Sequence, residues 1–430
     1  MLNRRAISKN TSEDRDRSCL RKVVFIAFLS IAIGCLYVFI VRPGTYYDEP
    51  SHLENVKYYS KYMKMPIMGS EGVSYEALQP PVYYGIFGLL YRFTHFVSEK
   101  FAFYAVRISG IIFLIPIVIL SVLIVRLAWP KEYELATATA LFIALNPAMC
   151  SIASSIQNDV LAIVLTLFSI YLSCNWMIEA KLTPHHAFVL GFLVAVSMLT
   201  KLTSLFMVVA IPVCAWVLWR RKAYFFILCF LIAIFGFIAW WVVRNQIYYG
   251  DPSGMKFFWK CYYAGKESIF SPFKAGDIIA LLRTTIADFW LPVEFYRNLI
   301  HAYWLRGVVA GLMLFSGIGW LLWYCTDNHT AINNRFSSGA KLAIVYYLIC
   351  IGVYFAGSVT VDAGCGRMVL PVIVFHAALV CGGGLFVFKR IHRAGAQVYI
   401  GILIAALLAA NSFVLWQISK LPTLPFHIIY

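Results

Sequence analysis

Charged residues are scarce in this sequence, where Asp, Glu, Lys and Arg together make up only 13% of the 430 residues. Hydrophobic residues make up 61% and the mean hydropathy is +0.76, values that exclude a soluble globular domain and are typical of a membrane protein with many spans. The sequence contains no glycine-rich nucleotide-binding loop, no repeat of fixed period and no coiled-coil pattern. None of its 11 cysteines stands in a C-x-x-C pair, so they indicate neither a zinc site nor a disulfide framework.

The net charge of +16 could suggest a nucleic-acid partner. However, the basic residues cluster in short loops between apolar runs, at 126–131, 220–222 and 389–393. Basic loops of this kind orient a membrane protein and contact anionic lipid headgroups. We therefore expect a lipid bilayer as partner and no nucleic acid. The sequence does not indicate an oligomeric state.

The apolar runs predict an all-α protein with about 11 transmembrane helices. The predicted spans are 23–41, 103–125, 135–149, 160–178, 187–200, 202–219, 223–243, 304–324, 342–358, a tenth that starts at 368, and 398–416. Residues 1–22 are rich in Arg and Lys, which predicts a cytoplasmic N-terminal tail, and 418–430 are expected to form a short outer tail.

Residues 82–97 could form a further span, but their tyrosines, arginine and histidine are typical of an interfacial helix. If this stretch lies at the surface, the three basic loops fall on the same side of the membrane as the N-terminus, as the positive-inside rule requires. The two large outer loops are then 42–102, which holds interfacial helices, and the aromatic segment 244–303.

The stretch D-E-P-S-H at residues 48–52 places carboxylates and a histidine where the bilayer meets water. Pro50 favours a helix start, because its missing N–H is not needed in the first turn. Asp48 would then either cap that helix through its side chain or act as a base that takes a proton from a hydroxyl. These residues alone do not decide between the two interpretations.

Several ionisable side chains from separate parts of the chain share the outer membrane level in this topology. They are Asp48, Glu49, His52, Asp159, Lys201, Arg244 and Arg367. Individually, a carboxylate can cap a helix and a cation can snorkel or anchor a span end. Ionisable groups at such depth are nevertheless costly and tend to be functional. Together they fit a site for an anionic phosphate leaving group and a neutral hydroxyl nucleophile.

The same stretch leaves open whether a metal ion binds. Asp48, Glu49 and His52 could supply two or three ligands, and hard carboxylates would suit Mg²⁺ or Mn²⁺. The other interpretation is that His52, one helical turn from Asp48, is simply its hydrogen-bond partner. We expect no firm cofactor and keep a divalent cation as an open alternative.

Six motifs follow one another along the chain: D-E-P-S-H, Q-P-P-V-Y-Y, Q-N-D, L-T-K-L-T-S, W-W-V-V-R-N-Q-I-Y-Y-G-D-P and C-G-R-M-V-L-P. In this order the sequence resembles the GT-C superfamily of integral-membrane glycosyltransferases, which contains the protein O-mannosyltransferases and the aminoarabinose transferases of lipid A. The resemblance covers about residues 40–372. Each motif alone is loose, but their order and common side of the membrane are more specific.

The resemblance implies a GT-C transmembrane domain over residues 23–417 and a polyprenyl-phosphate sugar as donor. It also implies a catalytic base at Asp48, assistance or acceptor binding at Asp159, and donor phosphate binding at Lys201, Arg244 and Arg367. We further expect substrate binding by the neighbouring residues of the first outer loop, Glu49, His52, Gln79, Tyr83 and Tyr84. The sequence departs from the superfamily pattern where Gln79 replaces a histidine and Met368 a tyrosine. These departures affect the subfamily more than the superfamily.

Bacterial members imply a location in the cytoplasmic membrane with the active site on the outer, periplasmic side. The expected reaction transfers a sugar to a glycan or glycolipid acceptor, such as O-antigen or another surface polysaccharide, with inversion at the anomeric carbon. Three alternatives remain: a secondary transporter or flippase for a lipid-linked sugar, a non-catalytic membrane scaffold, and a transferase that uses a lipid-diphosphate donor. The sequence names neither the sugar nor the acceptor.

Overall fold

The structure is a computed structural model. It describes residues 2–46, 48–70, 73–262, 290–291, 303–326, 337–361 and 366–420. Most of the predicted outer segment beyond Tyr262, the middle of the loop 325–341, and residues 421–430 of the predicted outer tail lie outside the described residues.

The described residues form helices and connecting loops, with no strand among them. The elements are α1 (Leu2–Ile40), α2 (Glu49–Tyr62), η1 (Tyr75–Leu78), α3 (Val82–His95), α4 (Glu99–Ile112), α5 (Leu114–Ala128), α6 (Tyr133–Ala144), α7 (Pro147–Ala153), α8 (Asp159–Ile178), α9 (Pro184–Met198), η2 (Leu202–Phe206), α10 (Met207–Trp219), η3 (Arg220–Ala223), α11 (Tyr224–Tyr249), α12 (Met255–Tyr262), α15 (Tyr303–Thr326), α17 (Ser338–Val361), η4 (Gly366–Val372), α18 (Ile373–Ile391) and α19 (Gly395–Ile418).

The helices confirm an all-α polytopic membrane protein. Eight stretches of the described chain are long and apolar enough to cross a membrane, and nine if the bent pair of α6 and α7 counts as one span. One of these stretches, Leu202–Tyr249, contains both α10 and α11, and α9 is a shorter apolar helix. Each of the predicted spans therefore coincides with a helix or a helix pair. The α3 helix, at residues 82–95, is not among the candidate spans, as expected for an interfacial helix.

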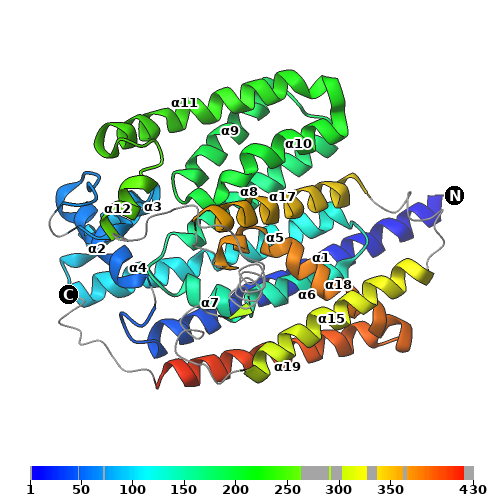
Figure 1. Ribbon diagram of the computed structural model, residues 1–430. Coiled ribbons are helices and arrows are strands. Elements are labelled where there is room, and N and C mark those ends of the chain that lie inside the picture. Colours follow the sequence, from blue (N-terminus) through cyan, green and yellow to red (C-terminus); the bar gives the residue numbers. More distant parts are fainter. Residues whose placement is uncertain are drawn as a thin grey trace.

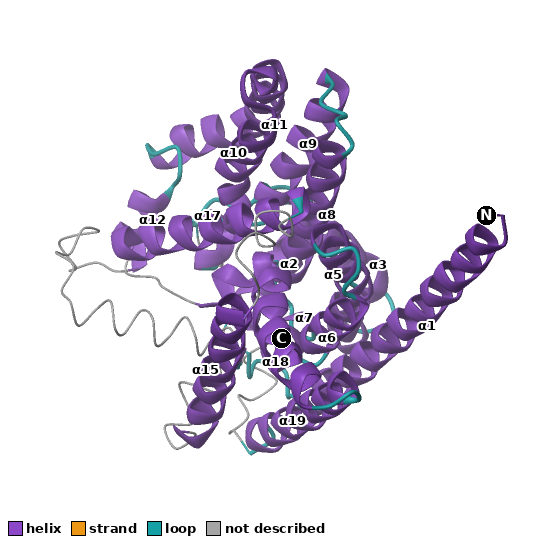
Figure 2. Ribbon diagram, turned by 90° about the vertical axis from the view of Figure 1, so that its right-hand side faces the viewer, coloured by secondary structure: helices purple, strands orange, loops and turns teal. Residues whose placement is uncertain are grey.

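The long helices run side by side in one bundle (Figure 1). Turned by 90°, the bundle has α9, α10 and α11 on one side and α15 and α19 on the other, with α5 and α8 between them (Figure 2). Helices pack in pairs within the bundle: α9 with α11, α5 with α8, and α15 with α18. The spans that contain α5 and α8 are more buried than those that contain α10, α11, α15 and α19.

The basic loops lie at one end of the bundle. The turns after α5, at η3 and after α18 gather at the end where α1 begins (Figure 1). At that end, Lys389 of α18 forms ion pairs with Glu132 and Glu134 before and within α6. The three basic loops thus lie on the same side as the start of α1, as the positive-inside argument assumes. The direction of the bundle in the membrane stays a prediction.

At the other end, the first loop folds over the bundle as α2, η1 and α3 (Figure 1). Gly88 allows α3 to approach α2 closely, since a Cβ at this position would lie 2.7 Å from the Cβ of Tyr59. Two interruptions between consecutive helices face this same end of the bundle. Asn146 caps α7 ahead of Pro147, and the chain leaves α9 in an extended conformation at Lys201.

Candidate active site

Asp48 precedes α2, in the N-cap position, but its side chain makes no capping hydrogen bond. Its carboxylate instead accepts hydrogen bonds from two side chains of other elements. Tyr75 of η1 donates its hydroxyl proton to Asp48 Oδ1 at 2.8 Å, and Arg367 of η4 pairs with Oδ2 through Nη2. The sequence leaves open whether Asp48 caps the helix or acts as a base, and the structure shows that its side chain does not cap the helix.

A second carboxylate–cation pair belongs to the same cluster. Asp159 is the first residue of α8, and its Oδ2 lies 2.6 Å from Nζ of Lys201. The two pairs adjoin, because Arg367 Nη1 donates a hydrogen bond to Gln157 Oε1 at 3.4 Å, just before α8. The structure thus brings Asp48, Asp159, Lys201 and Arg367 together from four separate parts of the chain.

The charge of Asp48 is strongly favoured in this setting. Burial alone would raise the pKa of its carboxyl, but the positive charge of Arg367, with His52 and two side-chain hydrogen bonds, outweighs that effect. The pKa of Asp48 falls to about 2. Asp48 is therefore a carboxylate over the whole physiological pH range.

His52 lies one turn into α2, on the Asp48 side of the cluster. Its Nδ1 is 2.6 Å from the hydroxyl of Tyr84, and the two rings stack. Burial lowers the pKa of His52 to about 3, against the opposing charge of Asp48. The imidazole is therefore neutral, and Tyr84 positions it.

Glu76 of η1 completes this side of the cluster, with its Oε2 atom 3.9 Å from His52 Nδ1. Among the described residues, Oε2 is a buried oxygen that has no hydrogen-bond partner. Burial and the negative charge of Asp48 raise the pKa of Glu76 to about 8. A buried acceptor without a partner is costly, and such atoms often mark functional positions.

Gln79 and the two predicted tyrosines line the same region. Gln79 Oε1 accepts a hydrogen bond of 3.2 Å from Asn158 Nδ2, which links the first loop to the start of α8. Tyr83 packs against Tyr84 and Phe87 and is buried. Tyr83 packs against Tyr84, and Tyr84 contacts His52, so the two tyrosines hold this part of the site in place.

Glu49 follows Asp48 directly in the sequence, but its carboxylate has a different set of partners. Its oxygens accept hydrogen bonds from four donors: Nε and Nη2 of Arg107 and the backbone N–H groups of Gly44 and Ile156. These four donors fill the acceptor sites of a carboxylate. The Glu49 side chain thus ties α4 and the turn between α7 and α8 to the first loop, and its contact with substrate stays a prediction.

Arg244, the third cation predicted at the donor phosphate, lies near the end of α11. Its Nη2 donates to the backbone oxygen of Pro66 at 2.6 Å, and its guanidinium lies over the rings of Tyr248 and Tyr249. No hydrogen bond or ion pair described for Arg244 joins it to Asp48, Asp159, Lys201 or Arg367. Its phosphate role remains a prediction.

The residues around Asp48 fit the donors that a divalent cation takes. Asp48, His52 and Glu76 are all buried and offer ligand atoms within 4.8 Å of one another. The Asp48 carboxylate, the neutral imidazole and the Glu76 carboxyl once it has lost its proton would suit Mn²⁺ and similar ions. Glu76 takes the place that the sequence assigned to Glu49, while Arg367 brings a competing positive charge to Asp48.

Sequence reasoning missed Glu76, Tyr75, Gln157 and Arg107. Arg107 could have been found, because it is a basic residue within the apolar run 103–125. A charged side chain in such a run is costly and is usually paired with another group. Glu76 and Gln157 stand within or beside the quoted motifs. Tyr75 carried no signal that distinguishes it from the other tyrosines of the loop.

No protein-family model and no curated protein sequence matches this chain. Solved structures do match. The archaeal oligosaccharyltransferase AglB from Archaeoglobus fulgidus, in complex with an inhibitory peptide and a dolichol-phosphate, is similar over 96% of this chain at 11% identity, with a TM-score of 0.57. The match covers 57% of that oligosaccharyltransferase, so this chain spans little more than half its length.

Two further structures are similar. The Archaeoglobus fulgidus oligosaccharyltransferase in its apo form matches 95% of this chain and 56% of its own at 11% identity, with a TM-score of 0.51. ArnT from Cupriavidus metallidurans, bound to undecaprenyl phosphate, matches 92% of this chain and 74% of its own at 14% identity, with a TM-score of 0.47. The similarity to the oligosaccharyltransferase confirms that this chain has the GT-C fold.

Proposed function

We propose that this protein is a glycosyltransferase that moves a sugar from a polyprenyl-phosphate donor to a hydroxyl acceptor. The observation that carries the proposal is the convergence of two carboxylate–cation pairs, Asp48 with Arg367 and Asp159 with Lys201, at one end of the helix bundle. The GT-C fold supports it independently, since the AglB structure of that fold contains a dolichol-phosphate.

The two cations serve the leaving phosphate. As the bond between the anomeric carbon and the phosphate oxygen breaks, negative charge develops on the polyprenyl phosphate. Lys201 and Arg367 lie in a poorly hydrated cluster, where fixed positive charges stabilise such an anion strongly. A lipid-phosphate donor carries no nucleotide, so binding it requires no nucleotide-binding loop, and the sequence contains no glycine-rich loop of that kind.

Asp48 serves the nucleophile. The acceptor oxygen attacks the anomeric carbon, its proton passes to Asp48, and the electron pair of the broken bond leaves with the phosphate. Arg367 keeps Asp48 ionised and Tyr75 fixes its orientation. Direct displacement with one base inverts the anomeric carbon. Asp159 orients the acceptor or Lys201, with which it is paired.

A divalent cation, if held by Asp48, His52 and Glu76, would supply further positive charge beside the leaving phosphate. The steps above use only the side chains of the chain itself. A bound metal ion would therefore add to the positive charge of Lys201 and Arg367 without replacing either side chain.

The proposed setting is the bacterial cytoplasmic membrane, with the N-terminus in the cytoplasm and the site on the outer side. The distribution of basic loops supports this direction. The proposed acceptor is a cell-envelope glycan or glycolipid, such as O-antigen.

The test uses purified protein in detergent and then in vesicles. It is given a polyprenyl-phosphate sugar with a labelled sugar, together with cell-envelope glycan as acceptor. The expected result is label in the glycan and release of polyprenyl phosphate, lost in Asp48→Asn. Movement of the labelled lipid across the vesicle membrane without a new glycosidic bond would instead identify a flippase and overturn the proposal.

A further inference from the structure

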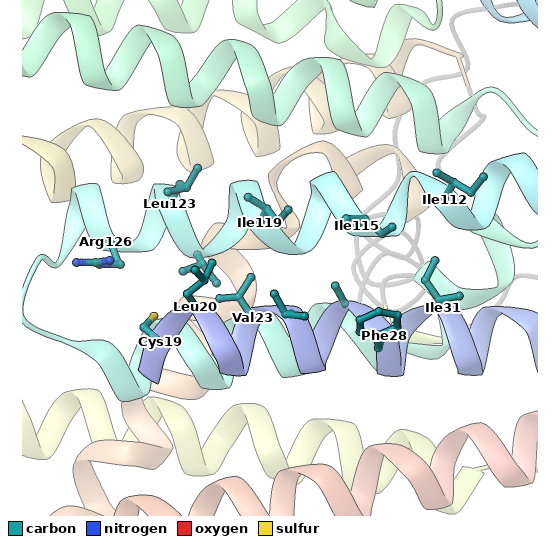
Figure 3. A pocket seen from close by; sticks show the side chains of 13 residues that line it. Cys19, Leu20, Val23, Phe28, Ile31, Ile112, Ile115, Ile119, Leu123 and Arg126 are labelled. Carbon is teal, nitrogen blue, oxygen red and sulfur yellow. The ribbon is translucent and has the colours of Figure 1, made fainter. Parts of the chain in front are cut away.

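A groove of about 600 Å³ runs between α1 and the helix pair α4–α5 (Figure 3), and none of its lining residues belongs to the candidate active site. One wall extends along α1 from Cys19 to Ile31, and the other from Ile112 to Arg126. All lining side chains except Arg126 are apolar. Phe28 is 70% exposed, so the groove opens to the outside of the bundle, where lipid lies. Its volume is in the range of about 300–1,000 Å³ that ligand pockets have.

Positive charge stands at one end of this groove. Arg126, in the last turn of α5, lies beside Cys19 and Leu20, as Figure 3 shows. The next two residues of α1, Arg21 and Lys22, are exposed at the same level. Basic side chains in this position attract anionic lipid headgroups.

The basic end of the groove points away from the candidate active site. The opposite end of α1, Ile40, leads directly to Asp48. A lipid whose phosphate contacts Arg126 is therefore anchored at the other membrane face from Lys201. For this reason the groove does not suit a donor lipid whose phosphate is held by the active-site cations.

The length of the groove fits one leaflet. From Cys19 to Ile31 the α1 wall is ~18 Å long at a rise of ~1.5 Å per residue, close to half of a hydrocarbon core of ~30 Å. An extended acyl chain in one leaflet covers the same depth. The apolar walls and the basic end thus match a lipid tail and its headgroup.

We propose that this groove binds a phospholipid with an anionic headgroup. One acyl chain lies between α1 and α5, and the headgroup phosphate contacts Arg126. Arg126 also lies over the ring of Tyr133, 5.0 Å from its centroid, which holds the guanidinium at the level of the headgroups. The proposal is independent of sugar transfer.

Native mass spectrometry of delipidated protein tests it, with phosphatidylglycerol and phosphatidylcholine of identical acyl chains offered together. The wild type should prefer phosphatidylglycerol by about tenfold, because the quaternary ammonium of phosphatidylcholine offsets the charge of the phosphate that Arg126 contacts. Arg126→Gln should reduce that preference to less than twofold, whereas Arg126→Lys should retain most of it. Ile119→Trp, which fills the groove from a position that is 41% exposed, should lower binding of both lipids.

Arg221→Gln is the matched control, because Arg221 is exposed in η3 and does not line the groove. It should bind lipid as the wild type does, and thermal unfolding should confirm that every variant is folded. Equal binding of the two lipids by the wild type, or a full preference in Arg126→Gln, would overturn the proposal. An unchanged Ile119→Trp variant would also overturn it, since the lipid would then lie outside the groove.

Discussion

Asp48 and Glu49 are neighbours in the sequence, both are buried, and each is paired with an arginine from a distant element, yet the two surroundings differ. Around Glu49, both partners are closed off: the side chains of Arg107 and Glu49 are 0% and 1% exposed. Around Asp48, the pair reaches the edge of a cluster, and the Arg367 side chain is 14% exposed. Glu49 has four donors, whereas Asp48 has two described side-chain donors.

The difference indicates how an ion pair that only holds the fold can be distinguished from one that can also contact a substrate. A carboxylate whose four acceptor sites are filled by fixed donors has no site for a substrate. A carboxylate with two donors, held ionised beside a second cation and a second carboxylate, can still accept a hydrogen bond from a substrate hydroxyl. The Glu49 region therefore fastens the first loop, whereas the Asp48 carboxylate keeps acceptor sites for the hydroxyl of the proposed acceptor.

The largest expected effect concerns the Glu49 region. Arg107→Leu leaves a buried carboxylate without its counter-charge, and we expect the free energy of unfolding to fall by about 3–5 kcal/mol. Equilibrium unfolding in detergent measures it. The double variant Glu49→Gln/Arg107→Leu should recover part of the loss. A change below about 1 kcal/mol in the single variant would contradict a structural role for this pair.

The next effect concerns Asp48 and is seen in transfer. Asp48→Asn keeps the size of the side chain but cannot accept a proton as a carboxylate does, so transfer should fall at least about a hundredfold. The purified variant should remain folded. Glu54→Gln is the matched control, because Glu54 lies exposed on the same helix, and it should act like the wild type. Wild-type turnover by folded Asp48→Asn would show that Asp48 is not the base.

A third prediction concerns the cation of the second pair. Lys201→Ala removes a charge-assisted contact of about 1.5–3 kcal/mol, so kcat/KM for the lipid-phosphate donor should fall about tenfold to a hundredfold. Steady-state kinetics with varied donor concentration measure this loss. Lys57→Ala, which removes a part-exposed lysine of α2, is the control and should leave kcat/KM unchanged. Equal kinetics of Lys201→Ala and the wild type would contradict phosphate binding by Lys201.

Much of the fold could be predicted from the sequence, because a membrane span has a strong local signal. The apolar runs give the helices, and the basic loops group their ends at one side of the bundle. The stretch 82–97 forms the 14-residue helix α3, which is not among the candidate spans, and its position at the membrane surface stays a prediction. Motif order was enough to suggest the GT-C fold, although each motif is short.

The pairing within the site could not be predicted in the same way. Asp48 and Arg367 are 319 residues apart, and nothing local tells which of several cations a carboxylate will meet. Similarly, the sequence cannot show that Arg107 pairs with Glu49 or that Glu76 lies beside His52. These assignments depend on how the helices pack, which composition and periodicity do not specify.

The smallest expected effect is on stability at low pH, and it separates the charge of Asp48 from its role in transfer. The pKa of Asp48 is lowered to about 2 from an ordinary value of 3.8. A lowered pKa stabilises the folded protein above the unfolded value, and this contribution is lost as pH falls through the folded value. The unfolding temperature of the wild type should therefore exceed that of Asp48→Asn by a few degrees at pH 5–8, with little change across that window. The difference should shrink as pH falls from about 4 towards 2, which thermal unfolding measures. A difference that grows in acid would mean that Arg367 does not stabilise the Asp48 carboxylate.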